Sequence, residues 1–441
     1  MRLAVILAAF ALWIAAPDTR LVAQTAQRPN IVLIISDDHR WDGLGAAGNP
    51  HAITPNLDRL AKDGVYFRQA VAHIPQCSPN RATILTGRSP HQTGWYSNQS
   101  QRKDVLGPNG LGANTFLPKL LQDSGYHTAL VGKWHLQQQP WLTGFGDVRT
   151  WIPGGGGPYF ELPVARGNAR MLAPAAGAFT QDLFGEDAVA YVKASSSRKQ
   201  PFFLWVALTA PHVPSAPNPD RIRRQYEGKT DDALLPPAFD RSAKVANWRT
   251  YYEAITSADE QVGRIMQALA DNNLTRNTIV LFMGDNGLMM HSRGWSGKVI
   301  PYEESVRVPF VIHAPALATF KGPTDAAASS LDLPTSIARW AGITVPGEWA
   351  GRDLTTALRS RTDHKLPHAI VEFPDTTSEQ FGRYAYRSIR TPAAKLILWE
   401  DKTKRDELYD LTRDPRETSN SSTTRSTIAR KQTCEGISKR G

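Results

Sequence analysis

The chain of 441 residues contains little cysteine: Cys77 and Cys434 are the two that it has. So few cysteines exclude a disulfide framework as the main source of stability, although such frameworks are common in small exported proteins. One bridge between the two cysteines is an alternative. We disfavour it because the residues around Cys77 favour a chemical role for that side chain.

Long apolar runs are also scarce. The run near the N-terminus, Leu3–Ala16, follows the basic Arg2 and precedes small residues around Ala23. It is shorter than the roughly 20 apolar residues that span a membrane, and this order of segments is typical of a signal peptide. We therefore predict a signal peptide at residues 1–23 and an exported protein, periplasmic or secreted, without a stable membrane span. An uncleaved membrane anchor is the alternative.

Acidic residues are outnumbered by basic ones, and the formal net charge is +10 at pH 7. An acidic substrate or an anionic glycan suits such a balance. A basic, solvated surface would give the same count, so the net charge alone does not decide between these interpretations.

Strand-like and helix-like segments alternate along most of the chain. Apolar runs rich in β-branched residues predict buried strands at residues 31–35, 127–131, 202–208, 278–283 and 308–312. Helices are predicted at residues 55–63, 115–123 and 251–270. In the first helix, Thr54 is the expected N-cap and Gly64 the stop. This alternation is typical of an α/β fold with a large, mainly parallel sheet flanked by helices on both faces.

The pattern changes at about Pro346, where shorter strand-like pieces begin. We predict an α/β domain over residues 29–345 and a smaller, mostly antiparallel α+β subdomain over residues 346–416. Residues 417–441 are polar, basic and rich in Ser and Thr, which predicts a disordered tail.

Polar residues recur where the predicted strands end. The residues at these ends are Asp37, Asp38, Lys133, His135, Asp285 and Asn286. Ligands of open parallel sheets bind beyond the carboxyl ends of the strands, and a hard cation would relieve the repulsion among three carboxylates and an amide oxygen. Each pair alone is more often a turn or a helix cap. Their recurrence at strand ends favours a metal site.

The most specific segment begins at Cys77 and continues through Pro79 and Arg81 to Gly87. It resembles the sulfatase family, in which a Cys-x-Pro-x-Arg motif directs oxidation of the cysteine to formylglycine. Other segments look like family motifs in family order: Asn30–Asp38, Thr54–Leu60, Gly132–His135, Ala210–His212, Gly284–Gly287, Gly297–Lys298, Glu303–Pro309 and Glu407–Asp410. The resemblance covers roughly residues 29–416.

The resemblance implies an alkaline phosphatase-like fold and a sulfuric ester hydrolase. It implies that Asp37, Asp38, Asp285 and Asn286 bind Ca²⁺, or alternatively Mg²⁺, and that the formylglycine made from Cys77 completes the coordination. The expected partners are a formylglycine-generating enzyme during maturation and a sulfated saccharide or small sulfate ester as substrate. Exported relatives often act on glycans, which favours a sulfated glycan. We expect no nucleic-acid partner.

The resemblance also assigns catalytic roles. Arg81 and Lys133 would stabilise the hydrated aldehyde, and His135 would act on its second hydroxyl. Lys298 and His212 would contact the sulfate and its bridging oxygen, with His212 donating a proton to the leaving alcohol. A hydrate held on a cation has an acidified hydroxyl that can attack sulfur.

This chain departs from the family pattern at two motifs. Asn80 stands where a small residue is more common, and His291–Gly294 (HSRG) stands where many members carry Gly-Glu-His-Gly. The first departure bears on conversion of Cys77 and the second on substrate contacts. Trp134, Trp295 and Tyr302 flank motif residues, either as sugar-stacking walls or as core aromatics.

Two other functions are compatible with these residues. The same apparatus would serve a phosphonate monoester or phosphodiester hydrolase. Alternatively, the chain would be a noncatalytic binder of anions or glycans in which Cys77 stays a thiol.

Overall fold

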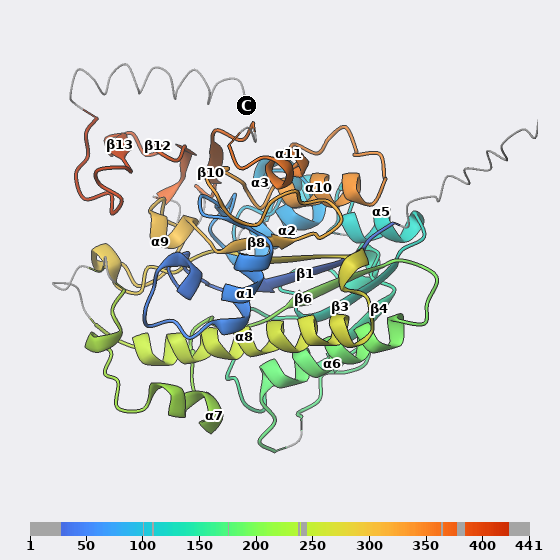
Figure 1. The fold of residues 1–441 in the computed structure, drawn as a ribbon. Helices are drawn as coiled ribbons and strands as arrows, with labels where there is room; N and C mark the ends of the chain where they lie inside the picture. Colours follow the sequence, from blue (N-terminus) through green and yellow to red (C-terminus); the bar gives the residue numbers. More distant parts are fainter. Residues whose placement is uncertain are drawn as a thin grey trace, which may run out of the picture.

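The structure, a computed structural model, describes residues 28–422 except 100, 108–109, 175, 237–238, 240–244, 363–364 and 377–383. It contains a nine-stranded sheet with the strand order β5-β4-β3-β6-β1-β7-β8-β2-β9 and a four-stranded sheet with the order β10-β11-β12-β13 (Figure 1). The strands of the large sheet are β1 (Asn30–Ser36), β2 (Val65–Phe67), β3 (His127–Lys133), β4 (Asp147–Ile152), β5 (Ala165–Arg166), β6 (Phe202–Ala207), β7 (Thr278–Gly284), β8 (Phe310–His313) and β9 (Gly322–Thr324).

The centre of the large sheet is parallel, as predicted. Strand β1 pairs in parallel with β6 and β7, and β3 pairs in parallel with β4 and β6. The strand expected at residues 308–312 is β8, which begins at Phe310 and runs antiparallel to β7. Every residue of β1 is buried because both faces of the sheet are covered, which explains its unbroken apolar run.

Helices cover both faces (Figure 1). They are α1 (Pro55–Asp63), α2 (Cys77–Thr86), α3 (Pro90–Thr93), α4 (Lys103–Leu106), α5 (Leu117–Asp123), α6 (Thr180–Ser195), α7 (Asp220–Arg223), α8 (Trp248–Asp271), α9 (Glu303–Val306), α10 (Asp332–Trp340) and α11 (Thr355–Arg359). Alternate residues of β1 face opposite cores: Ile31, Leu33 and Ile35 pack with α2, α5 and α10, whereas Val32 and Ile34 pack with α1, α6 and α8. This alternation follows from the period of two in a strand.

The four-stranded sheet is antiparallel and comes from the C-terminal part of the chain. Its strands are β10 (Ala369–Phe373), β11 (Tyr386–Arg390), β12 (Ala394–Trp399) and β13 (Glu407–Asp410). One face packs on residues of the large unit such as Val71, Met289 and Val306, which lie outside the strands of the large sheet. These residues and the small sheet form a core of their own.

Two local expectations need correction. Thr54 occupies the N-cap position of α1 but makes no capping hydrogen bond, because its hydroxyl oxygen accepts from the main-chain N–H of Gly45 at 2.9 Å and its hydroxyl donates to Asp58. Glu417 was expected to begin a disordered tail, yet it is completely buried, since Lys395 supplies an opposite charge 2.6 Å from its carboxylate.

The other terminal predictions cannot be compared with the fold. The predicted signal peptide, residues 1–23, and the tail residues 423–441 lie outside the described residues. Among the helices that the structure describes, none is long and apolar enough to cross a membrane.

Candidate active site

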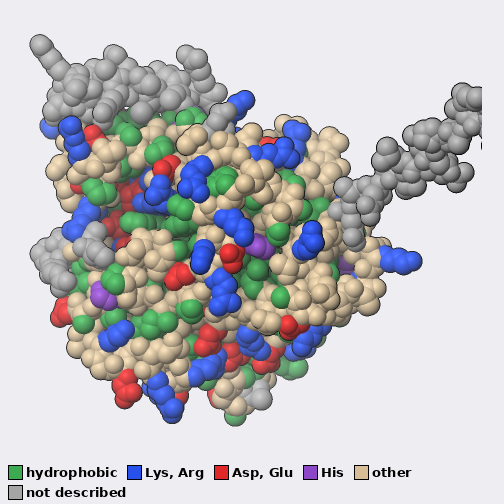
Figure 2. Space-filling view, viewed as in Figure 1, with side chains coloured by type: hydrophobic (Ala, Val, Ile, Leu, Met, Phe, Trp, Pro, Cys, Tyr) green, Lys and Arg blue, Asp and Glu red, His purple; other side chains and the backbone are tan. Residues whose placement is uncertain are grey.

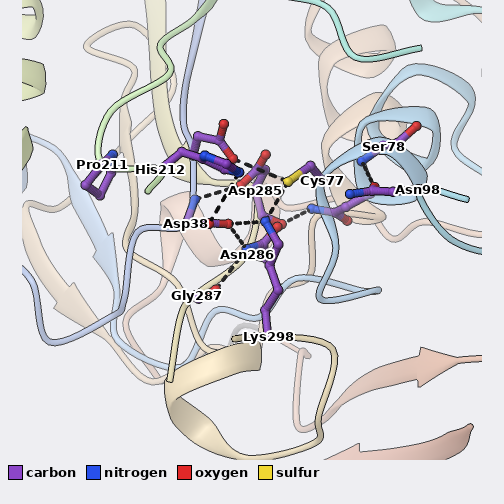
Figure 3. Close-up of polar contacts among 12 residues, drawn as sticks. Asp38, Cys77, Ser78, Asn98, Pro211, His212, Asp285, Asn286, Gly287 and Lys298 are labelled. Atoms are coloured by element: carbon purple, nitrogen blue, oxygen red, sulfur yellow. Dashed lines mark hydrogen bonds and ion pairs between the residues drawn. The ribbon is translucent and has the colours of Figure 1, made fainter. Parts of the chain in front are cut away.

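The predicted polar residues meet at the carboxyl ends of the central strands. Asp37 and Asp38 follow β1, Asp285 and Asn286 follow β7, and Cys77 is the first residue of α2. In Figure 3, side chains from these separate elements converge with His212 and Lys298 on one point.

Asp37 lies between a thiol and an ammonium group. Its Oδ1 accepts from Cys77 Sγ at 3.4 Å, and its Oδ2 forms an ion pair with Lys133 Nζ. Burial alone would raise the pKa of this carboxyl, but Lys133 and the other nearby cations hold it well below its usual range. Asp37 is therefore an anion at neutral pH.

Asp285 is the second fixed carboxylate. Arg81 Nε and Nη2 donate to its Oδ2 at 3.1 and 2.8 Å, and the main-chain N–H of Asp38 donates to its Oδ1 at 3.2 Å. Burial, together with the nearby Asp37 carboxylate, raises the pKa of Asp285 to about 6. Burial is the larger cause of this raised pKa, and the repulsion from Asp37 adds to it.

Asn286 supports a cation at this point. Its Nδ2 donates to Asp38 Oδ1 at 2.6 Å and to Gly287 O at 2.8 Å, while its Oδ1 is buried and has no hydrogen-bond partner. An orphaned amide oxygen beside three carboxylates matches the all-oxygen donor set that Ca²⁺ and Mg²⁺ prefer. The residues present therefore fit a hard divalent cation.

The geometry also adds a residue to the expected metal group. Donor atoms of Asp37, Asp38, Cys77 and His212 all lie within 4.8 Å of one another. His212 Nε2 is 3.8 Å from Asp38 Oδ2, and burial lowers the pKa of His212 below its ordinary value, against the pull of Asp37 and Asp38. We keep His212 among the candidate catalytic residues because its side chain is 24% exposed, whereas Asp37, Asp38 and Cys77 are buried.

Cys77 faces Lys298, whose Nζ donates to its Sγ at 2.8 Å and also forms an ion pair with Asp38. Burial, with the Asp37 carboxylate, raises the pKa of the Cys77 thiol to about 12. Burial disfavours the Lys298 ammonium, but Asp38, Cys77 and Asp37 together raise its pKa well above the ordinary value. An unmodified Cys77 would thus be a poor nucleophile at neutral pH.

The first turn of α2 positions Cys77. All ten residues of this helix are buried, and it ends at Gly87, whose φ of 65° is left-handed. The helix N-terminus carries a partial positive charge that favours a bound anion. Sequence patterns did not predict α2, because a helix that is buried all round has no amphipathic period.

His135 stands apart from this hydrogen-bond network. Its Nδ1 is buried without a partner. Burial is the main cause that lowers the pKa of His135 to about 2, and the positive charges of Lys133 and Arg81 lower it further.

The loop Pro153–Pro158 covers both His135 and His212. A Cβ added to Gly155 would lie 2.8 Å from His135 Nε2, and one on Gly156 would lie 3.2 Å from His212 Nδ1. Glycine therefore permits the main chain to approach both rings.

Three supporting residues were not predicted. Tyr251 donates from its hydroxyl to Asp38 O at 2.7 Å, and Tyr159 donates to His212 O at 2.9 Å. Asn80, noted as a departure from the family pattern, donates to Asp285 O and accepts from Ser330 Oγ at 2.6 Å. Only Asn80 had a signal in the sequence, because it stands inside the motif.

The flanking aromatics have different roles. Trp134 is a buried core residue in edge contact with Phe145. Tyr302 stacks on the guanidinium of Arg293, 3.8 Å from the ring centre. Trp295 is 39% exposed and is the most exposed of the three.

The charge of the chain is not gathered on the face seen in Figure 2, where basic and acidic side chains are interspersed. The net charge of +10 therefore does not by itself mark a binding surface on that face. The concentrated charge of the molecule lies in the buried cluster beyond β1 and β7.

Comparisons with known families agree with this geometry. A family model described as Sulfatase matches residues 29–343, and one described as N-sulphoglucosamine sulphohydrolase, C-terminal, matches residues 291–434. An ulvan-active sulfatase of Formosa agariphila is 28% identical over 380 residues, covering 82% of this chain and 71% of the relative. The N-acetylgalactosamine-6-sulfatase of Sus scrofa is 30% identical over 377 residues, covering 76% of this chain and 67% of the relative. The chain spans 65% of the mouse protein of that name.

Solved structures share the fold. The yidJ protein of Bacteroides fragilis has a TM-score of 0.82 at 26% identity, covering 93% of this chain and 95% of that one. A phosphonate monoester hydrolase of Agrobacterium radiobacter has a TM-score of 0.72 at 22% identity, with 94% of each chain covered, and shows the fold alone. The predicted alkaline phosphatase-like α/β fold, with its smaller antiparallel sheet, is confirmed.

Proposed function

Because the chain belongs to the sulfatase family, and is therefore a sulfuric ester hydrolase, we propose that it acts through a formylglycine made from Cys77. One observation carries the proposal: Cys77 Sγ lies within hydrogen-bonding reach of Asp37 and Lys298 at the first turn of α2, yet its thiol pKa of about 12 makes it a poor nucleophile. The position suits a reacting group, and the unmodified side chain does not.

The proposed metal group comprises Asp37, Asp38, Asp285, Asn286 and the modified residue 77. Ca²⁺ is our first assignment and Mg²⁺ the alternative. When bound, the cation would supply charge that acidifies a hydroxyl of residue 77 and stabilises negative charge on the sulfate. The orphaned Asn286 Oδ1 and the raised pKa of Asp285 support this assignment.

The remaining residues divide the work of binding and proton transfer. Arg81 and Lys133 hold Asp285 and Asp37 in place and surround residue 77 with positive charge. Lys298 Nζ keeps its proton at neutral pH and would bind the sulfate and its bridging oxygen. His212 would donate a proton to the leaving alcohol, and His135, covered by Gly155, would accept one from the hydroxyl that releases sulfate.

We propose a sulfated glycan as the substrate, because two relatives are named for ulvan and for N-acetylgalactosamine-6-sulfate. The exposed Trp295 would offer a stacking surface to a sugar ring. Maturation by a formylglycine-generating enzyme and export to the periplasm or medium complete the proposal. The catalytic domain would span residues 29–345, with a smaller subdomain at residues 346–416.

The test is turnover of a panel of sulfated saccharides by matured protein, together with the mass of the peptide Gln69–Arg81. We expect the mass of formylglycine in this peptide and release of sulfate from at least one saccharide. Side-by-side rates on matched sulfate and phosphonate esters separate a sulfatase from a phosphonate monoester hydrolase. An active protein whose peptide carries an unmodified thiol would refute the proposed nucleophile.

A further inference from the structure

The segment that carries Lys298, residues 287–303, has a costly main-chain conformation. Four of its non-glycine residues have left-handed φ values: Met290 (47°), His291 (68°), Arg293 (55°) and Val299 (74°). A β-branched residue in this region is a conformational outlier, and each such conformation is energetically unfavourable. Contacts elsewhere must therefore hold the segment in the shape that points Lys298 at Cys77.

Several parts of the chain hold this segment: Arg40 Nη1 donates to Leu288 O, Met289 O and Ser292 Oγ, and the N–H of Val299 donates to Pro75 O at 3.2 Å.

A further set of contacts comes from the last described part of the chain. Arg293 Nη1 donates to the main-chain oxygen of Arg416 at 3.0 Å and to that of Glu417. At the other end of the segment, the main-chain N–H of Glu303 donates to Glu417 Oε2 at 2.8 Å. Glu417 thus contacts residues on both sides of Lys298 in the sequence.

Glu417 is itself firmly held. It is completely buried, with a left-handed φ of 57°. Lys395 Nζ, from β12, lies 2.6 Å from Glu417 Oε1 and 2.8 Å from Glu303 Oε1, and donates to Pro301 O at 2.9 Å. A buried lysine therefore compensates the charge of Glu417 and ties it to the second sheet.

The departure at Arg293 now has a structural explanation. Where many family members carry a histidine, the Arg293 guanidinium stacks on Tyr302 and donates to two carbonyl oxygens of the C-terminal segment. None of these contacts reaches Cys77 or the carboxylates around it. This side chain therefore serves the shape of the segment.

We propose that Glu417 is a positioning residue for the reaction: through Arg293 and Glu303 it fixes residues 287–303 and so places Lys298 Nζ against residue 77. The inference rests on the proposed function only in the role given to Lys298. That Glu417 helps to hold residues 287–303 in their conformation is a property of the fold and does not depend on the role of Lys298.

The experiment compares Glu417→Ala and Glu417→Gln with Glu372→Gln. Glu372 is another buried glutamate, on β10, but its ion-pair partners are His73, His91 and Arg387, none of them in residues 287–303. Arg293→Ala removes the other contact of the C-terminal segment and tests the same idea if Glu417→Ala does not fold. All variants are matured, and rates are expressed per formylglycine found in the peptide Gln69–Arg81.

The first readout is hydrogen exchange of residues 287–303, which needs no activity. We expect Glu417→Ala and Arg293→Ala to speed exchange there by at least 10-fold, and Glu372→Gln to leave it unchanged. Glu417→Gln keeps an oxygen for the Glu303 N–H, so its exchange should lie in between. Unchanged exchange in both Glu417→Ala and Arg293→Ala would overturn the inference, even for a protein inactive on every sulfate ester.

The second readout is kinetic. Because a misplacement of about 1 Å can cost 10²-fold, we expect Glu417→Ala to lower kcat by 10- to 100-fold with a smaller change in KM, and Glu372→Gln to change kcat by less than about 3-fold. In a Lys298→Ala background, Glu417→Ala should cause little further loss, since its effect passes through Lys298. Full additivity of the two losses would contradict the positioning role. Inactive wild-type protein with normal protection of residues 287–303 would sink the proposed function instead.

Discussion

The segment that carries Lys298, residues 287–303, contributes one charged residue to each of two buried charge clusters. The site cluster comprises Asp37, Asp38 and Asp285 with Arg81, Lys133 and Lys298. The interface cluster comprises Glu303 and Glu417 with Arg390 and Lys395. In the interface cluster, Glu303 and Glu417 lie 2.6–2.8 Å from a buried cation, whereas the site cluster lies beside an amide oxygen and an imidazole nitrogen that have no partner. Each carboxylate of both clusters has a cation of the chain beside it, and Glu417 Oε1 also accepts no hydrogen bond. What distinguishes the site cluster is the neutral amide oxygen of Asn286 and the imidazole nitrogen of His135, which lie beside it without partners.

This difference separates two uses of buried charge. A buried ion pair contributes little net stability, because desolvation offsets the attraction, but removing one partner is costly. The site cluster also keeps limited contact with solvent, through His212 and Lys298, whose side chains are 24% and 14% exposed. We therefore expect changes in the site cluster to affect mainly the rate, and changes in the interface cluster to affect the stability as well as the rate.

The largest effect should follow from Cys77→Ala. The substitution removes the proposed nucleophile, so kcat should fall by about four powers of ten or more, while the midpoint of thermal unfolding should change little. The measurement is sulfate release under conditions where the wild type turns over. The matched control is Cys77→Ser, which should be nearly as poor without a serine-type maturation system. A Cys77→Ala protein retaining a hundredth of the activity would assign the nucleophile to another residue.

Metal removal should have the next largest effect. A cation that stabilises several kcal/mol of developing charge accounts for roughly 10³-fold in rate. Chelation should therefore abolish measurable activity, and Ca²⁺ or Mg²⁺ should restore it. Chelation should also lower the unfolding temperature of the wild type but not that of Asp285→Ala, which lacks a ligand. Stoichiometric zinc on Asp37, Asp38 and Asp285 in active protein would contradict the assignment of a hard cation.

The two clusters also differ in how far sequence could predict them. Asp37, Asp38, Asp285 and Asn286 follow strands whose apolar runs are unmistakable, so their meeting beyond the sheet could be expected. The interface cluster could not be predicted in this way, because Glu417 lies in a stretch whose polar composition predicts an exposed tail. Its burial depends on Lys395 and Glu303, which reach it from other elements.

Helices show the same limit of prediction. The long α8 has a strong amphipathic period and was predicted to within a few residues. The ten-residue α2, which carries Cys77, was not, because polar side chains such as Asn80 and Arg81 are buried on it by partners more than 50 residues away. Long-range polar contacts leave no local periodicity for a sequence argument to use.

A third prediction concerns His212. If it protonates the leaving alcohol, His212→Ala should lower kcat on sugar sulfates by about 10² to 10⁴-fold but have a much smaller effect on an activated aryl sulfate, whose phenolate leaves unaided. Paired rates on the two substrates are the measurement. The control is Val213→Ala, which trims the exposed neighbour of His212 and should leave both rates within a few-fold. Equal losses on both substrates would remove His212 from this role.

The smallest effect concerns stability at the junction of the two sheets, where Glu372 lies 3.4 Å from His73 Nε2 and 3.2 Å from His91 Nε2. Burial alone would raise the pKa of Glu372, but the two imidazoles lower it to about 2 from an ordinary value of 4.5. A carboxyl with a depressed pKa stabilises the fold above its unfolded pKa and loses that contribution as pH falls through the folded one.

Glu372→Gln should therefore lower the free energy of unfolding by at most about 3 kcal/mol at pH 5, and the difference from wild type should shrink steadily between pH 4.5 and pH 2. Urea unfolding at pH 5, 4 and 3 measures the slope. The control Glu400→Gln removes an exposed carboxylate 3.9 Å from Arg387 on the same sheet and should change little at any pH. A difference that grows on acidification would mean that Glu372 is protonated in the native protein, and its contacts would then resemble the strained carboxylates of the site cluster more than the satisfied pairs between the sheets.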